Sequence, residues 1–213
     1  MYVEVPQDVI GRLNKQLESV PERIPEVLRK TINSTAQFGK KDIPQRVKEK
    51  YALKNVSRRV KERVAVYEPA RGKNYQATIR LEGRPEPLFN FHVRKNGIRV
   101  SAKANVLSSS SLKDLTTVKD GETLKAFVVK IKNRSKGGEE SHHVGVFRRY
   151  SKEELKVTPK AKHRRNGIKQ LYSTSIPQMA KNDKVYPKIE EDIKEKLREN
   201  LEKHIAVVME GMT

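Results

Sequence analysis

The sequence predicts an α+β fold with N-terminal helices, a mostly antiparallel β-sheet with long loops in the middle, and a long amphipathic helix at the C-terminal end. Apolar residues recur first at helical spacing, then at strand spacing, and again at helical spacing near the C-terminus. We therefore distinguish an N-terminal helical region (1–62), a β-rich region (63–150), a basic arm and turn (151–180) and a C-terminal helix (181–213). Together they are expected to form one compact domain.

The N-terminal region is expected to contain two main helices. Apolar residues at helical spacing place the first over residues 7–19 and the second over residues 24–36. Gly39 is expected to end or loosen the second helix, because glycine is a weak helix former. Pro44 should kink the helix or restart it before residues 45–51, because proline lacks the N–H that a helix interior needs.

Short strands should make up the β-rich region. Residues 64–67 and 76–81 are rich in β-prone side chains and flank a loop in which Gly72 can supply the positive φ of a hairpin. The same patterns predict further strands over residues 98–102, 125–132 and 144–147.

Three polar stretches are expected outside regular structure. Residues 105–122 include four consecutive serines and should form an exposed, mobile loop, and residues 133–141 should form a second polar loop. Residues 151–167 are basic and carry few large apolar side chains, which is typical of a flexible arm. We expect the two loops to be cut by proteases until the protein meets its partners.

The C-terminal region is expected to be the longest helix. Its apolar residues fall at every fourth position: Val185, Ile189, Ile193, Leu197, Leu201 and Ile205, with Val208 continuing the face. A four-residue step is slightly longer than the 3.6-residue helical period, so the apolar stripe winds slowly around the helix. Such a helix should contact more than one surface.

Composition indicates a modest hydrophobic core and a negatively charged partner. Hydrophobic residues make up 35% of the chain, and 46 Lys and Arg against 26 Asp and Glu give a net charge of +20. Residues 181–213 are near neutral, so the excess lies in residues 1–180, and both DNA and an acidic protein surface fit it. The absence of cysteine excludes disulfides and is consistent with a reducing cytoplasm. No apolar run reaches the about 18 residues of a membrane span, and no secretory signal is recognisable.

Catalytic and metal-binding patterns are missing. His142 and His143 are adjacent and would point to opposite faces of a strand, which does not suit one metal ion. Neither a P-loop nor a nucleophile elbow is present. We therefore expect no enzymatic activity, no cofactor and no metal.

Two sets of residues are candidates for binding. The first set consists of candidates for a protein–protein interface. Two alternatives stay open for its members: residues 171–179 could equally be a core plug that seats the C-terminal helix, and Arg148 and Arg149 could equally keep an edge strand soluble. The second set consists of basic residues that could neutralise the phosphates of a nucleic acid, face solvent, or form ion pairs with an acidic neighbouring protein. We favour contacts with neighbouring subunits over specific nucleic-acid recognition. The interface candidates are Arg71, Gly72, Phe147, Arg148, Arg149, Leu171, Tyr172, Pro177 and Met179. The polyanion candidates are Arg58, Arg59, Lys160, Lys162, Arg164 and Arg165.

Several segments together resemble the phage minor tail protein Z family. The most informative is the run Val144 to Tyr150 followed by residues 168–179, where this chain reads Ser173-Thr174 at the place of the family's Gly-Pro. The segments 27–36, 46–51 and 53–60 match in character and order.

The resemblance implies a structural virion protein that completes or terminates the tail at its head-proximal end and supports head–tail joining and DNA passage. It implies a ring, a hexamer by analogy with tail tubes, and as neighbours the tail tube or terminator protein, the tape-measure protein and head-completion proteins. It implies no reaction and no membrane. We expect the isolated protein to be largely monomeric. The alternative function is that of a basic protein that binds nucleic acid. Non-specific contact with DNA is compatible with both functions.

Overall fold

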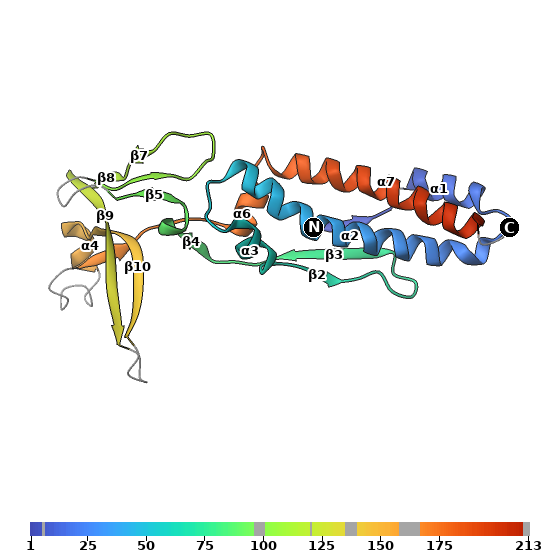
Figure 1. Cartoon of the computed structure of the whole chain (residues 1–213), viewed down its shortest axis with the longest axis horizontal. Coiled ribbons are helices and arrows are strands. Elements are labelled where there is room, and N and C mark those ends of the chain that lie inside the picture. The colour runs from blue at the N-terminus through green and yellow to red at the C-terminus, as the bar shows by residue number, and fades with distance from the viewer. Residues whose placement is uncertain (6, 96–100, 120, 135–139, 158–166, 211–213) are drawn as a thin grey trace. The chain divides into compact units, whose positions relative to one another are not determined.

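The computed structural model describes residues 1–213 except residues 6, 96–100, 120, 135–139, 158–166 and 211–213 (Figure 1). The fold is α+β, as predicted, and all strand pairings are antiparallel in the described part of the chain. The chain divides into two compact units, each discontinuous in sequence. Unit 1 consists of Met1–Lys48, Asn55–Gly83 and Ile176–Thr213; unit 2 consists of Glu49–Lys54 and Arg84–Ser175. This division differs from the expected single domain of four consecutive segments.

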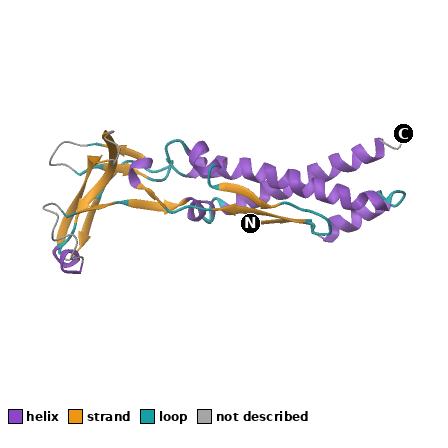
Figure 2. Ribbon diagram, turned by 90° about the horizontal axis from the view of Figure 1, so that it is seen from below, coloured by secondary structure: helices purple, strands orange, loops and turns teal. Residues whose placement is uncertain are grey.

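Unit 1 packs helices along a small sheet. Its strands are arranged in the order β1-β3-β2. Helices α2 and α7 lie side by side (Figures 1 and 2) and run antiparallel, because Thr35 bonds to Asn200 whereas Arg46 bonds to Asp192. The strands are β1 (Tyr2–Glu4), β2 (Val64–Glu68) and β3 (Gln76–Leu81). The helices are α1 (Gln7–Gln16), the 3₁₀ turn η1 (Pro21–Arg23), α2 (Ile24–Lys50), α3 (Val56–Lys61), α6 (Ile176–Ala180) and α7 (Tyr186–Glu210).

Helix α2 runs without interruption through Gly39 and Pro44, so the expected end and restart of the helix at these residues were wrong. Both residues are buried. A Cβ on Gly39 would lie 2.8 Å from Cδ1 of Ile79 and 3.1 Å from Cδ1 of Ile193. Glycine is therefore needed for the close approach of α2 to β3 and α7, and tertiary packing overrides its weak helix propensity.

The apolar stripe of the C-terminal helix is confirmed. Val185 and the five residues that follow it at every fourth position are buried up to Ile205, and Val208 is half-buried. The hairpin of β2 and β3 is also confirmed, and Gly72 in its loop has a φ of +54°.

Unit 2 consists mainly of small antiparallel sheets. The strand orders are β11-β10-β9-β8, β5-β6-β7 and β12-β4. The strands are β4 (Pro85–Pro87), β5 (His92–Arg94), β6 (Lys103–Asn105), β7 (Lys113–Asp114), β8 (Thr116–Lys119), β9 (Glu122–Arg134), β10 (Glu140–Arg149), β11 (Ile168–Gln170) and β12 (Tyr172–Ser175). The helical segments are the 3₁₀ turn η2 (Leu88–Asn90) and α4 (Lys152–Val157).

Several stretches predicted as loops carry regular structure. Residues 105–122 are largely exposed but contain β7 and β8, and residues 133–141 include the ends of β9 and β10. The expected flexible arm begins with α4, and within the region expected as basic arm and turn (151–180), Tyr172–Ser175 form strand β12, paired with β4. Backbone pairing with neighbouring strands accounts for these differences, because it stabilises extended chain even where side chains are polar. Of the strand predicted over 98–102, residues 98–100 lie outside the described residues, and residues 101–102 precede strand β6 and are not part of it, so the prediction was wrong for these two residues.

Candidate functional site

The interface candidates do not gather at one place. Arg71, Gly72, Pro177 and Met179 belong to unit 1, and the other five belong to unit 2. Met179 is fully buried, which favours the core-plug interpretation for that residue, whereas Tyr172 is exposed and donates a hydrogen bond to Gln170 (3.2 Å).

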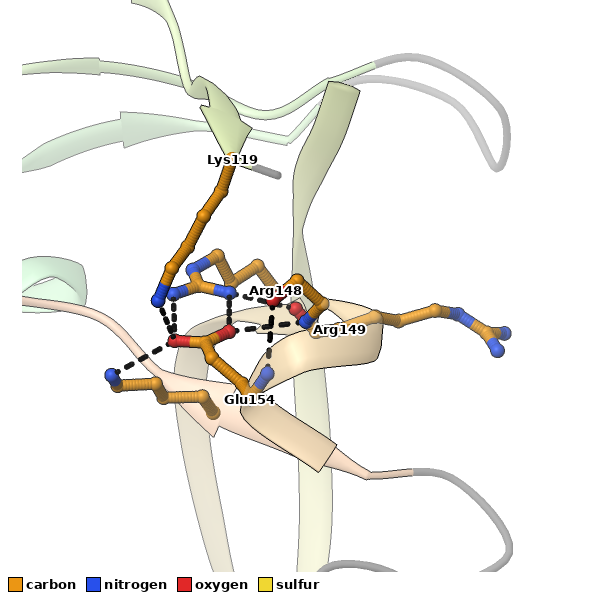
Figure 3. Close-up of polar contacts among 6 residues, drawn as sticks. Lys119, Arg148, Arg149 and Glu154 are labelled. Carbon is orange, nitrogen blue, oxygen red and sulfur yellow. Dashed lines mark hydrogen bonds and ion pairs between the residues drawn. The ribbon is translucent and has the colours of Figure 1, made fainter. Parts of the chain in front are cut away.

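The end of β10 carries a cluster of charges that we call the Glu154 cluster: Glu154 with Lys119, Arg148 and Lys169 (Figure 3). The three cations come from three strands of one sheet, β8, β10 and β11. Arg148 is paired with Lys169 and with Ala126, and Lys119 is paired with Glu122. Since side chains alternate between faces along a strand, this register places all three cations on one face of the sheet.

Glu154 holds the cluster together. Its Oε2 accepts a bond from Arg148 Nη1 (2.6 Å), and its Oε1 accepts one from Arg148 Nη2 (2.8 Å), so the pair is bidentate. Lys119 Nζ lies 3.0 Å and Lys169 Nζ 3.5 Å from the same Oε1. Only 8% of the Arg148 side chain and 11% of the Glu154 side chain are exposed. One shielded carboxylate therefore faces three cations, which leaves an excess of two positive charges.

A capping box at the start of α4 positions the carboxylate. Ser151 N–H donates to Glu154 Oε2 (3.1 Å), and Glu154 N–H donates to Ser151 Oγ (3.2 Å). The hydrogen bonds from Arg148, and then those from Ser151 N–H and Lys119, hold the pKa of Glu154 far below its ordinary value of 4.5, although desolvation acts in the opposite direction. The bond to Glu154 in turn raises the pKa of Arg148. The motif Ser-x-x-Glu at residues 151–154 was the sequence signal that could have predicted this helix start.

Arg149 follows Arg148 but points away from the cluster (Figure 3) and is exposed. Lys152, 84% exposed, pairs with Glu122 at 3.0 Å. The two arginines predicted together thus have different environments: Arg148 is held in a shielded ion pair, and Arg149 is available at the surface.

A second charged surface lies in unit 1 around Arg71 and Gly72. It is an open groove of about 800 Å³ lined by Glu26, Arg29, Lys30, Asn33, Ser34, Ala70, Arg71, Gly72 and His204. Arg29 donates to the carbonyl of Gly72 (3.0 Å), and Asn33 bonds both the N–H and the carbonyl of Ala70. His204 Nε2 lies 3.3 Å from Ser34 Oγ. Desolvation, and then the charge of Lys30, lowers the pKa of His204.

The polyanion candidates are only partly described. Arg58 is exposed and lies 3.9 Å from Glu62, and Arg59 is half-buried on the same helix, α3. Lys160, Lys162, Arg164 and Arg165 lie outside the described residues. The role of Lys119 and Lys169 could not be predicted from the sequence, because only the strand register brings the two residues together.

The adjacent histidines lie on β10. His143 Nε2 is 3.2 Å from Gln170 Oε1, and its ring meets that of Phe147 edge to face. No set of three or more His, Asp or Glu side chains among the described residues is placed to hold a metal ion. Within the same part of the chain, no helix is both long and apolar enough to cross a membrane.

Comparison with protein-family models, with curated proteins and with solved structures gave no match.

Proposed function

We propose that this protein is a structural subunit of a long-tailed phage that completes or terminates the tail at its head-proximal end. The resemblance of residues 27–36, 46–60 and 144–179 to the minor tail protein Z family supports the location in the virion. The two-stranded ribbon of β9 and β10 supports the more general role of a subunit that binds other subunits in an assembly.

The ribbon is the observation that carries the proposal. Strand β8 pairs with β9 only up to Lys125, and β11 pairs with β10 only from Phe147 onward. Backbone bonds from the neighbouring loops extend this support to Ala126 and Val146. Beyond these points, strands β9 and β10 pair with each other, and no other described residue pairs with their outer edges.

An unsupported ribbon of this kind calls for a partner. An isolated two-stranded hairpin is marginally stable in water, and an open strand edge is a template for pairing with another chain. Val128, Val129 and Ile131 on the ribbon are only half-buried. A neighbouring subunit would cover both the backbone edge and these side chains. In the proposed role the neighbours are further copies in a ring, the tail tube or terminator protein, the tape-measure protein and head-completion proteins.

The test is electron microscopy of phage particles that carry a label on this protein. We expect the label at the head–tail junction. Ile131→Lys in the ribbon should fold, as judged by circular dichroism, but should be lost from particles, because a charge would be buried against the neighbour. Val207→Lys is the matched control, since Val207 is exposed on α7 and should tolerate the change. Particles without label, or equal incorporation of both variants, would refute the proposal.

A further inference from the structure

The positive charge of the chain is concentrated in unit 2. Its segments contain 23 Lys and Arg against 9 Asp and Glu, a net charge of +14. Unit 1 contains 23 Lys and Arg against 17 Asp and Glu, a net charge of +6. Basic side chains are thus equally numerous in both units, and unit 2 differs in lacking the acidic residues that would balance them. This imbalance favours a polyanionic partner for unit 2.

The Glu154 cluster presents cations and conceals its anion. Lys119 and Lys169 are 41% and 49% exposed, whereas Glu154 is shielded and already accepts bonds on both oxygens. Each ammonium has three donors and uses one of them on Glu154. Both lysines therefore keep donors that can reach an oxygen of a bound anion.

The residue types favour phosphates over an acidic protein surface. Apart from Arg148, which is shielded, the cations that pair with Glu154 are lysines. Lysine is depleted from the cores of protein–protein interfaces, where arginine and aromatic residues are enriched. It is well suited to phosphate as a point charge. No aromatic side chain belongs to the cluster, so the stacking that holds single strands is not provided.

We propose that this end of unit 2 binds the phosphate backbone of duplex DNA without sequence preference. Lys119 and Lys169 donate to phosphate oxygens, and Lys152, which pairs with Glu122 next to Lys119, adds positive charge at the rim. Glu154 and Arg148 act as positioning residues that hold the two lysines side by side. The inference does not depend on the role in the phage tail, because it concerns the purified chain alone.

The test is binding of the full chain to a fluorescently labelled DNA duplex, measured by anisotropy over a salt titration. The double variant Lys119→Gln/Lys169→Gln removes two contacts and leaves the Arg148–Glu154 pair intact. Each lost phosphate contact should reduce the slope of log K against log salt by about 0.9. We expect the slope to fall by about 2 and the affinity at low salt to fall at least roughly tenfold.

The matched control is Lys30→Gln/Lys194→Gln, which removes the same charge from two exposed, ion-paired lysines of unit 1. Its salt slope should stay near that of the wild type. If the cluster variant does not fold by circular dichroism, Lys152→Gln tests the rim, because Lys152 is 84% exposed and its ion pair is with Glu122. This variant should lower the slope by up to about 1.

Three results would overturn the proposal. Equal losses in the cluster variant and the control would reduce the effect to net charge. Tighter binding of poly-glutamate than of DNA would assign the surface to an acidic protein. Tighter binding of duplex RNA than of duplex DNA would exclude DNA as the preferred ligand. Loss of DNA binding with normal incorporation into particles would separate this site from the structural role.

Discussion

Replacing Glu154 by glutamine should destabilise unit 2 more than any other single charge removal on α4. The change keeps the shape of the side chain but removes the charge shared by Arg148, Lys119 and Lys169. It also weakens the bond that Ser151 N–H donates at the helix start. Three cations would then face one another without a counter-ion.

The size of the effect follows from the shielding of the pair. Removing one partner of a buried ion pair costs about 3–5 kcal/mol, whereas an exposed pair contributes about 0–1 kcal/mol. Because 11% of Glu154 remains exposed and two of its partners reach solvent, we expect the lower end, a loss of about 3 kcal/mol in the free energy of unfolding. For a unit of this size such a loss lowers Tm by roughly 12–24 °C.

Thermal unfolding followed by circular dichroism measures the loss, and hydrogen exchange of peptides from β10 and α4 assigns it to unit 2. Glu153→Gln is the matched control on the same helix, since Glu153 is 55% exposed and pairs only with Lys156 among the described residues. It should change stability by less than about 0.5 kcal/mol. A loss below about 1 kcal/mol for Glu154→Gln, or equal losses for the two variants, would refute the view that the cluster is a shielded structural network.

Three further outcomes are expected. The difference in the free energy of unfolding between wild type and Glu154→Gln should be constant above about pH 5 and should become smaller in acid. The reason is that the pKa of Glu154 in the folded protein lies below 4.5, so the stabilisation by its carboxylate is lost as the pH falls toward the folded pKa. Urea unfolding at a series of pH values measures this difference. Gly11→Ala should raise the free energy of unfolding, measured by urea denaturation, by up to about 1 kcal/mol, since nothing lies within 4 Å of the added Cβ. Gly39→Ala should give no such gain, since its Cβ would displace Ile79, and an equal gain in both variants would contradict the close packing of α2. Unit 1 of the wild type should lose stability below about pH 6.5, because the pKa of His204 is lowered in the folded protein and the unfolded chain therefore binds the proton more readily. His204→Gln should abolish this loss, and an unchanged dependence of stability on pH would disprove the role of His204.

Regular periodicity made part of the fold predictable. The stripe from Val185 to Ile205 and the hairpin around Gly72 follow from local patterns, and the structure has both. Gly39 and Pro44 were misread because propensity describes an isolated helix, whereas α2 is stabilised by the β3 and α7 surfaces against which it packs.

The candidate site was only partly predictable. Arg148 and Arg149 were recognised as a pair, but their division into a shielded and an outward residue depends on strand alternation at the end of β10. Lys119 and Lys169 lie far apart in sequence, and no local pattern indicates that β8 and β11 flank the same hairpin. The capping box of α4 is recognisable in the sequence as the motif Ser-x-x-Glu, and it predicts that the side chain of Glu154 is fixed at the start of a helix.

The discontinuous composition of unit 1 has a consequence for synthesis on the ribosome. Helix α2 is made early, yet the helix that covers it, α7, is made only after the whole of unit 2 has been translated. Unit 2 can complete its fold once Ser175 has emerged, whereas the apolar face of α2 has to wait for residues 186–210. Slow translation after unit 2 should therefore expose α2 to chaperones and to aggregation, and nascent chains stalled before α7 should bind chaperones more strongly than chains stalled after it.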